Sequence, residues 1–121
     1  MRRLMETFAY NAGLVTEEIV QSRYEASVRP GAQDAFARLF PEPRQQRLDA
    51  LATPEATIRT IQAPVLIVHG REDVIVPVEV AYRYSALLPH SELHVFGECG
   101  HWTQIEKRDR FLEVVTPFLA A

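Results

Sequence analysis

The sequence has little of three things: cysteine, net charge and long hydrophobic runs. Its single cysteine, Cys99, excludes an internal disulfide framework and is typical of a reducing compartment, so we expect a cytoplasmic protein. The formal net charge of −3 gives no basis for binding nucleic acid or an anionic membrane. The longest apolar stretch, residues 63–68, is far too short to cross a bilayer, and the opening MRRLMETFAY lacks the apolar core of a signal peptide.

The first 60 residues predict helices separated by prolines. Thr16 is a suitable N-cap for a helix over residues 17–28, because two glutamates follow it and favour the positive end of a helix dipole. Thr53 and Pro54 have the N-cap and first-turn pairing of another helix start. Further helices are predicted at 32–40 and 44–52. No strand pattern occurs in this half of the chain.

After residue 61 the pattern changes to alternating strands and helices. VLIVH at 65–69 is a continuous aliphatic run, which predicts a strand buried on both faces. ELHVF at 92–96 is the second predicted strand, and helices are expected between the strands and at the end of the chain. This order predicts an α/β protein with parallel strands and right-handed crossovers.

Two strands are too few for a stable parallel sheet. Each buried strand needs neighbours on both edges, and no other strand candidate exists in the sequence. The sequence therefore predicts that the sheet is incomplete and that the chain is a piece of a larger fold.

Polar side chains follow both predicted strands. Asp73 lies in the loop HGREDVIVP after the first strand, and His101 lies in the loop GECGHW after the second. Loops after parallel strands open at the same edge of a sheet, so we expect Asp73 to reach His101. An aspartate that binds Nδ1 of a histidine fixes its tautomer and stabilises the imidazolium. Taken singly, each residue also has a simpler interpretation, as a turn aspartate and a packed surface histidine.

The runs PVLIVHGREDVIVP and LHVFGECGHW resemble the last third of an α/β-hydrolase. The resemblance implies that Asp73 is the triad acid and His101 the triad histidine. It further implies that residues 1–60 form a helical lid and that residues 61–121 form the C-terminal βαβα part of the hydrolase core. The predicted fold class is thus the C-terminal portion of an α/β-hydrolase: lid helices, the last two parallel strands and their flanking helices.

The stretches HVFGECGHWTQIE and RYEAS are similar to the meta-cleavage product carbon–carbon hydrolases. FAY and FPEPRQ are in keeping with the 2-hydroxymuconate-semialdehyde hydrolases among them. In that family Arg23 would face the polar head of a small dienoate substrate, and Trp102 would line the same pocket. Without the family, Arg23 is a solvated charge and Trp102 a packing residue. Relatives of this kind commonly self-associate, so a homo-oligomer is a further expectation.

The sequence lacks the nucleophile that an α/β-hydrolase needs. None of its four serines, Ser22, Ser27, Ser85 and Ser91, lies in a G-x-S-x-G elbow. Cys99 is not in an elbow either, because no helix is expected directly after its loop, and a packed thiol is the better interpretation. The histidines form no close-spaced ligand pair, so no metal site is predicted, and the resemblance implies that no cofactor is needed. We therefore expect the chain alone not to turn over substrate.

Three functional alternatives remain, and the resemblance implies the first. The preferred one is a fragment whose parent hydrolyses a carbon–carbon bond in aromatic meta-cleavage products by a Ser-Asp-His triad. The second is an esterase or another small-molecule hydrolase of the same fold. The third is a non-catalytic binding or assembly module that uses the lid and the sheet edge as a surface. A signalling domain with Asp73 as phosphate acceptor is disfavoured, since it needs about five strands.

Overall fold

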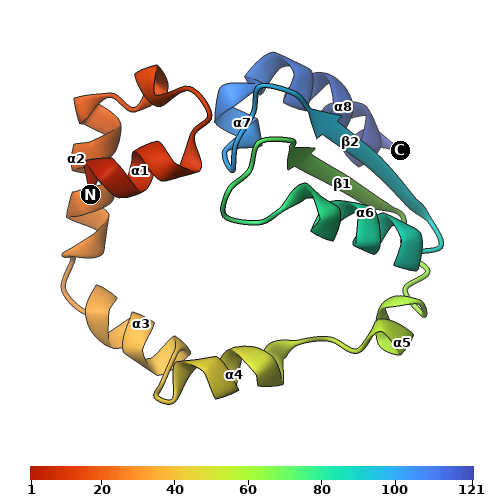
Figure 1. Cartoon of the computed structure of the whole chain (residues 1–121), viewed down its shortest axis with the longest axis horizontal. Coiled ribbons are helices and arrows are strands. Elements are labelled where there is room, and N and C mark those ends of the chain that lie inside the picture. The colour runs from red at the N-terminus through yellow and green to blue at the C-terminus, as the bar shows by residue number, and fades with distance from the viewer.

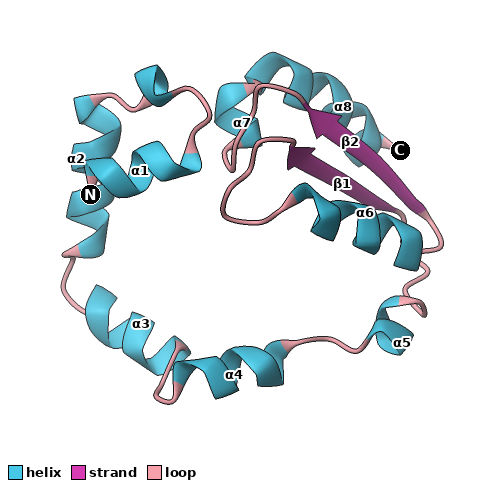
Figure 2. Cartoon of the chain, viewed as in Figure 1, coloured by secondary structure: helices cyan, strands magenta, loops and turns pink.

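Helices occupy the first half of the chain, and two strands with three helices occupy the second, in a computed structural model that describes all residues, 1–121. Before the sheet come helices α1 (Arg2–Phe8), α2 (Glu17–Ser27), α3 (Ala32–Leu39), α4 (Arg44–Leu51) and α5 (Glu55–Ile58), with a short 3₁₀ turn at Ala12–Leu14. Then follow β1 (Val65–Gly70), α6 (Val78–Leu87), β2 (Ser91–Phe96), α7 (Thr103–Glu106) and α8 (Arg108–Ala120). Figure 2 shows that both strands lie in the second half, as predicted.

The predicted helix starts are confirmed in one case and corrected in another. Thr16 caps α2, since its side-chain oxygen accepts a hydrogen bond from the backbone N–H of Ile19. Thr53 is not an N-cap, because α5 begins at Glu55 directly after Pro54 and has no side-chain cap. Pro54 is itself the N-cap residue, so it lies just before the helix and not in its first turn as predicted. Helix α1 was not predicted, since no side-chain cap marks its beginning.

The two strands form a parallel pair, as the sequence predicts. Their register aligns Val65 with Ser91 and Gly70 with Phe96, so both strands end at the same edge. Helix α6 makes the crossover and packs against both strands, while α8 contacts β1. In Figure 1 the strands lie between α6 and α8.

The expectation that residues 65–69 are buried on both faces is wrong for this chain. All five are only half-buried. The physical reason is that the sheet has two strands, so each strand keeps one edge without a hydrogen-bonded neighbour. An aliphatic run indicates that a strand is suited to a fully buried position in a sheet. The strands that would flank it in such a position are not present in this chain.

The buried core is small and lies in two separate clusters. Only 13 of 121 residues are buried. One cluster joins the N-terminal helices to the residue after His101 and consists of Met5, Ala9, Val15 and Trp102. The other lies under α6 and consists of Ile58, Leu87 and Leu88. Large apolar side chains stay exposed along α3 and α4, namely Phe36, Leu39, Leu48 and Leu51.

The ribbon traces an open ring (Figure 1). Helices α2, α3, α4 and α5 follow one another around it, and α1 returns beside α7 and the loops after the two strands. The contact between Phe8 of α1 and residues 101 and 102 thus joins segments that lie far apart in the sequence. None of the helices combines the length and the apolar character that crossing a bilayer requires.

Candidate active site

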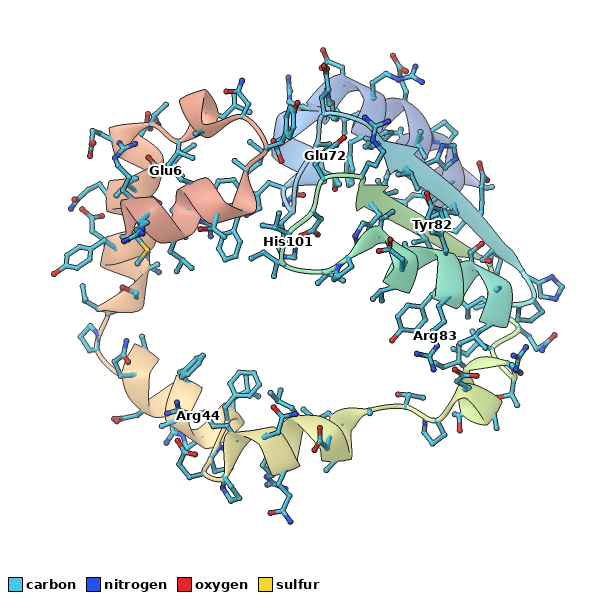
Figure 3. The ribbon with its side chains drawn as sticks, in the orientation of Figure 1. Glu6, Arg44, Glu72, Tyr82, Arg83 and His101 are labelled. Atoms are coloured by element: carbon cyan, nitrogen blue, oxygen red, sulfur yellow. The ribbon has the colours of Figure 1, made fainter.

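Asp73 and His101 meet at the edge where β1 and β2 end. Because Gly70 and Phe96 are register partners, the loops that follow them leave the sheet side by side. The distance between Nδ1 of His101 and Oδ2 of Asp73 is 2.8 Å, within hydrogen-bonding range. Figure 3 shows His101 between α1 and the sheet, on the inner side of the ring. The proximity predicted from the parallel strands is therefore found.

The Asp73 carboxylate is buried and held by its own loop. Its Oδ1 atom accepts hydrogen bonds from the backbone N–H groups of Ile75, at 2.8 Å, and Val76, at 3.0 Å. Burial alone would raise the pKa of Asp73, but the N–H of Val76, the His101 ring and the N–H of Ile75 outweigh it and lower the pKa below its usual value. Asp73 is thus an ionised acceptor with one oxygen directed at His101.

His69 is a second histidine at this carboxylate, and sequence reasoning did not assign it a role. Its Nε2 atom lies 2.8 Å from the carbonyl oxygen of Val76 and 3.6 Å from Oδ2 of Asp73. A carbonyl can only accept, so Nε2 of His69 carries the hydrogen. His69 therefore ties the end of β1 to the loop that holds Asp73. One indication of this role was present in the sequence: His69 is the polar residue at the end of the aliphatic run at 65–69, close to the loop that holds Asp73.

The His101 ring is packed on one side and accessible on the other. Its side chain is 38% exposed, and the Phe8 ring lies over it with 5.4 Å between centroids. The backbone N–H of His101 donates to the carbonyl oxygen of Phe8 at 2.7 Å. With Nδ1 facing Asp73, Nε2 is the nitrogen that a substrate or nucleophile could approach.

Glu72 joins the two loops directly, next to Asp73 in sequence. Its backbone N–H donates to the carbonyl of Cys99, and its carboxylate accepts from the N–H of Cys99, both at 3.0 Å. The Cys99 N–H is the main cause that lowers the pKa of Glu72. Figure 3 shows Glu72 among the loops beyond the strand ends. This reciprocal pair fixes the spacing of the acid loop and the histidine loop.

Cys99 is a packed thiol. It has no exposed surface, and burial, followed by the charge of Glu106, raises its pKa to about 11. A thiol with that pKa is protonated at neutral pH and is a poor nucleophile. Helix α7 was not predicted, but it begins at Thr103 and so does not follow Cys99 immediately. The loop between β2 and α7 nevertheless carries the thiol inward, and a nucleophile elbow would expose it.

The structure does not bring Arg23 to the Asp73–His101 pair. Arg23 is exposed on α2 and lines a shallow groove with Ile19 and Ile105. No hydrogen bond or ion pair joins it to Asp73 or His101. The groove does reach α7, which follows the histidine loop, so Arg23 lies on a surface continuous with that region.

Trp102 is a buried residue in this chain. It packs with Met5, Ala9 and Val15, and the Phe8 ring lies 5.7 Å away between centroids. Its present contacts are thus with the N-terminal helices. This placement matches the packing interpretation and leaves its predicted role in substrate binding as a proposal.

None of the four serines lies at a turn between a strand and a helix, where the nucleophile of an α/β-hydrolase is found. Ser22 and Ser27 lie on α2 and Ser85 lies on α6. Ser91 begins β2, at the opposite end of the strand from the histidine loop, and its hydroxyl donates to backbone carbonyls. The structure also contains no group of three or more His, Cys, Asp or Glu side chains that could hold a metal ion.

Comparisons with known proteins agree with this arrangement. A family model described as the alpha/beta hydrolase fold matches residues 14–108. The chain is 50% identical, over all of its 121 residues, to 2-hydroxy-6-oxo-2,4-heptadienoate hydrolase of Pseudomonas putida, of which it covers 44%. It is 48% identical to a 2-hydroxymuconate semialdehyde hydrolase of Pseudomonas putida, covering 99% of this chain and 43% of that protein. These relatives confirm the resemblance predicted from the sequence motifs.

Solved structures give the same result. A meta-cleavage product hydrolase of Pseudomonas fluorescens matches with a TM-score of 0.90 and 50% identity, covering 99% of this chain and 44% of that one. A Rhodococcus 2-hydroxy-6-oxo-6-phenylhexa-2,4-dienoate hydrolase matches with a TM-score of 0.84 and 32% identity, covering 99% and 43%. The chain therefore spans less than half the length of the relatives that it matches.

Proposed function

Because the chain belongs to the alpha/beta hydrolase fold family, we propose that it carries the acid, the histidine and the substrate-binding helices of a carbon–carbon bond hydrolase. The observation that supports this most directly is the 2.8 Å contact between Asp73 and His101 at the ends of adjacent parallel strands. The reaction class comes from relatives named as hydrolases of 2-hydroxy-6-oxo dienoates and of 2-hydroxymuconate semialdehyde. The proposed substrate is a small dienoate from meta ring cleavage.

In this proposal Asp73 and His101 work as a pair. The ionised Asp73 holds the Nδ1–H of His101, so Nε2 is free to take up and return a proton. His101 would move protons during ketonisation of the dienol and would activate the nucleophile. Water then completes the hydrolysis, which gives a short carboxylic acid and a 2-hydroxydienoate. Water is the only co-reactant, and the proposal assigns no step to a cofactor or a metal.

The helical residues 1–60 would act as the lid and residues 61–121 as the C-terminal part of the core. On the lid, Arg23 would bind the carboxylate and 2-oxo end of the substrate, for which a planar guanidinium is suited. Trp102 would contact the substrate from beneath the lid. For Arg23 to do so, the lid must bring α2 over the histidine loop, and the groove shared with Ile105 supports that direction of approach.

The nucleophile in this proposal comes from outside the 121 residues. No serine of the chain is placed to pass a proton to His101, and the buried Cys99 is unsuited to the task. An incomplete triad leaves weak background catalysis at best. A cytoplasmic location and self-association belong to the same proposal. The free, buried thiol of Cys99 supports the location.

A reconstitution experiment tests this function. The purified chain is combined with the stretch of the Pseudomonas putida heptadienoate hydrolase that it does not cover. Loss of the dienoate chromophore and release of the short acid are then measured. We expect hydrolysis by the combination and none by either part, with a loss of about a thousandfold or more in His101→Ala. A covalent fusion of the two stretches gives the same test without requiring assembly.

Arg23 separates this function from the alternatives. Arg23→Gln should weaken turnover of the dienoate and leave hydrolysis of a simple ester unchanged, with exposed Arg38→Gln on α3 as the matched control. Ester hydrolysis without dienoate hydrolysis would identify an esterase. Assembly with neither activity would favour the non-catalytic binding module, for which the exposed Phe36, Leu39, Leu48 and Leu51 offer an apolar surface.

A further inference from the structure

Glu106 of α7 joins two segments from opposite ends of the chain. Its Oε1 atom accepts a hydrogen bond from the backbone N–H of Gly100 at 2.8 Å. Its Oε2 atom accepts from the N–H of Tyr10 at 2.7 Å and from the N–H of Asn11 at 3.2 Å. One carboxylate thus binds three backbone donors, one in the histidine loop and two in the segment after α1.

The segment at residues 8–11 is pressed against the histidine loop at the same place. The carbonyl of Phe8 accepts from the N–H of His101, and the Phe8 ring packs on the imidazole. A side chain at Gly100 would come within 2.7 Å of the Phe8 carbonyl oxygen and 2.8 Å of the Tyr10 nitrogen. Glycine at position 100 is therefore what lets Glu106 draw the two segments together.

We propose that Glu106 is a positioning residue for His101, coupling the placement of segment 8–11 to the orientation of the imidazole. This inference rests on the proposed function, in which His101 is the base. The residue before His101 is bound by Glu106, and the residue before that, Cys99, is bound by Glu72. Three successive backbone N–H groups, at positions 99 to 101, therefore donate to three different residues.

The chemistry requires a carboxylate at position 106. Two ionised oxygens can accept from both segments at once. Glutamine has one acceptor oxygen and one NH₂ group. If the oxygen accepts from one of the two segments, the NH₂ group, which is a donor, faces the backbone N–H donors of the other segment. Glu106→Gln can therefore bind either Gly100 or the Tyr10–Asn11 pair, but not both. Because Asp73 is held separately by Ile75 and Val76, a shift of the histidine loop changes the contact of His101 with Asp73.

The test is NMR on the 121-residue chain, with no substrate involved. In the unmodified chain we expect a protected Nδ1 proton signal of His101 and slow amide exchange at Gly100, Tyr10 and Asn11. In Glu106→Gln the His101 signal should weaken or shift, and exchange should rise about tenfold or more at Gly100 or at the Tyr10–Asn11 pair. Glu98→Gln is the matched control, since Glu98 is an exposed carboxylate of the histidine loop and binds no backbone N–H.

Three outcomes would overturn the proposal. The first is an unchanged His101 signal in Glu106→Gln. The second is an equal acceleration of all amides, the strand amides of β1 and β2 included, which would mean general destabilisation. The third is measured on the folded, unmodified chain, so it also serves if Glu106→Gln does not fold. It is exchange of the Gly100 amide hydrogen at the rate of a free peptide. Because none of these measurements uses turnover, failure of the proposed function and failure of this inference are distinguishable.

Discussion

One carboxylate oxygen of Asp73 lies near both His101 and His69: Oδ2 is 2.8 Å from Nδ1 of His101, within hydrogen-bonding range, and 3.6 Å from Nε2 of His69. The other oxygen accepts two backbone N–H groups of the same loop. Each oxygen of the acid thus has a hydrogen-bond partner, which explains how a buried aspartate stays ionised. Nδ1 of His101 is bound to that charge, whereas Nε2 of His69 is bound to the carbonyl oxygen of Val76.

Asp73→Asn should destabilise the chain in a pH-dependent way. Because the folded-state pKa of Asp73 is lowered, its charge stabilises the fold above the unfolded value of about 3.9, and this contribution is lost as pH falls through the folded-state pKa. We expect a loss of about 1–3 kcal/mol in the free energy of unfolding at pH 7, shrinking toward pH 3. Urea unfolding at both pH values measures it.

Asp49→Asn is the control for this change, since Asp49 is exposed on α4 and bonded only to Gln45. It should change the unfolding free energy little at either pH. A destabilisation by Asp73→Asn that is equal at pH 7 and pH 3 would contradict the assignment of an ionised, donor-bound carboxylate.

Gly70→Ala should damage the site through the backbone. An added Cβ at this position would collide with the carbonyl oxygens of Gly100 and Cys99, in the histidine loop. These are backbone atoms held by Glu72 and Glu106, so they cannot move aside cheaply. We expect a loss of several kcal/mol, at the upper end of single substitutions, with loss of the Asp73–His101 contact. Thermal unfolding and the His101 Nδ1 proton signal report the two effects.

Gly13→Ala is the matched comparison. Its Cβ would meet only the Asn11 side chain, at 3.0 Å from Oδ1, and that side chain can rotate. If Gly70→Ala and Gly13→Ala had the same melting temperature, the close approach of the two loops would be refuted.

The course of the chain and the meeting of Asp73 with His101 could be predicted from sequence because both depend on local pattern. The aliphatic runs marked the strands, and parallel strands necessarily bring their following loops to one edge. The supports of His101 could not be predicted, since they come from long-range pairs. Tyr10 and Glu106 are 96 residues apart, and no local pattern links them. The half-burial of β1 was missed for the same reason: it depends on neighbouring strands, not on the strand's own residues.

Cys99 should resist thiol reagents in the folded chain. Burial raises its pKa to about 11, so the folded chain holds far less thiolate at pH 8 than the unfolded chain, and its side chain has no exposed surface. We expect negligible modification by a disulfide reagent at pH 8 and rapid, complete modification after unfolding in guanidinium. Modification of the native chain at the unfolded rate would show that the loop between Glu98 and Gly100 opens, and the structural thiol interpretation would fall.

Trp102→Ala should detach the N-terminal helices while the βαβα unit stays folded. The indole is the one member of its buried cluster that comes from the second half of the chain, so its removal leaves Met5, Ala9 and Val15 without their main contact. Truncating a buried aromatic residue costs about 3–5 kcal/mol. In a chain with so small a core, that loss should open the N-terminal contact. Limited trypsin digestion should then cleave faster at Arg23 on α2, with cleavage at Arg83 on α6 unchanged.

Tyr82→Ala is the control, since it removes an aromatic side chain that is 51% exposed on α6, and it should leave both cleavage rates as they are. Equal protection of Arg23 in Trp102→Ala and in the unmodified chain would mean that the polar contacts of Glu106 and Phe8 hold the N-terminal segment without the indole. Trp102 would then be available to the substrate pocket and unnecessary to the fold.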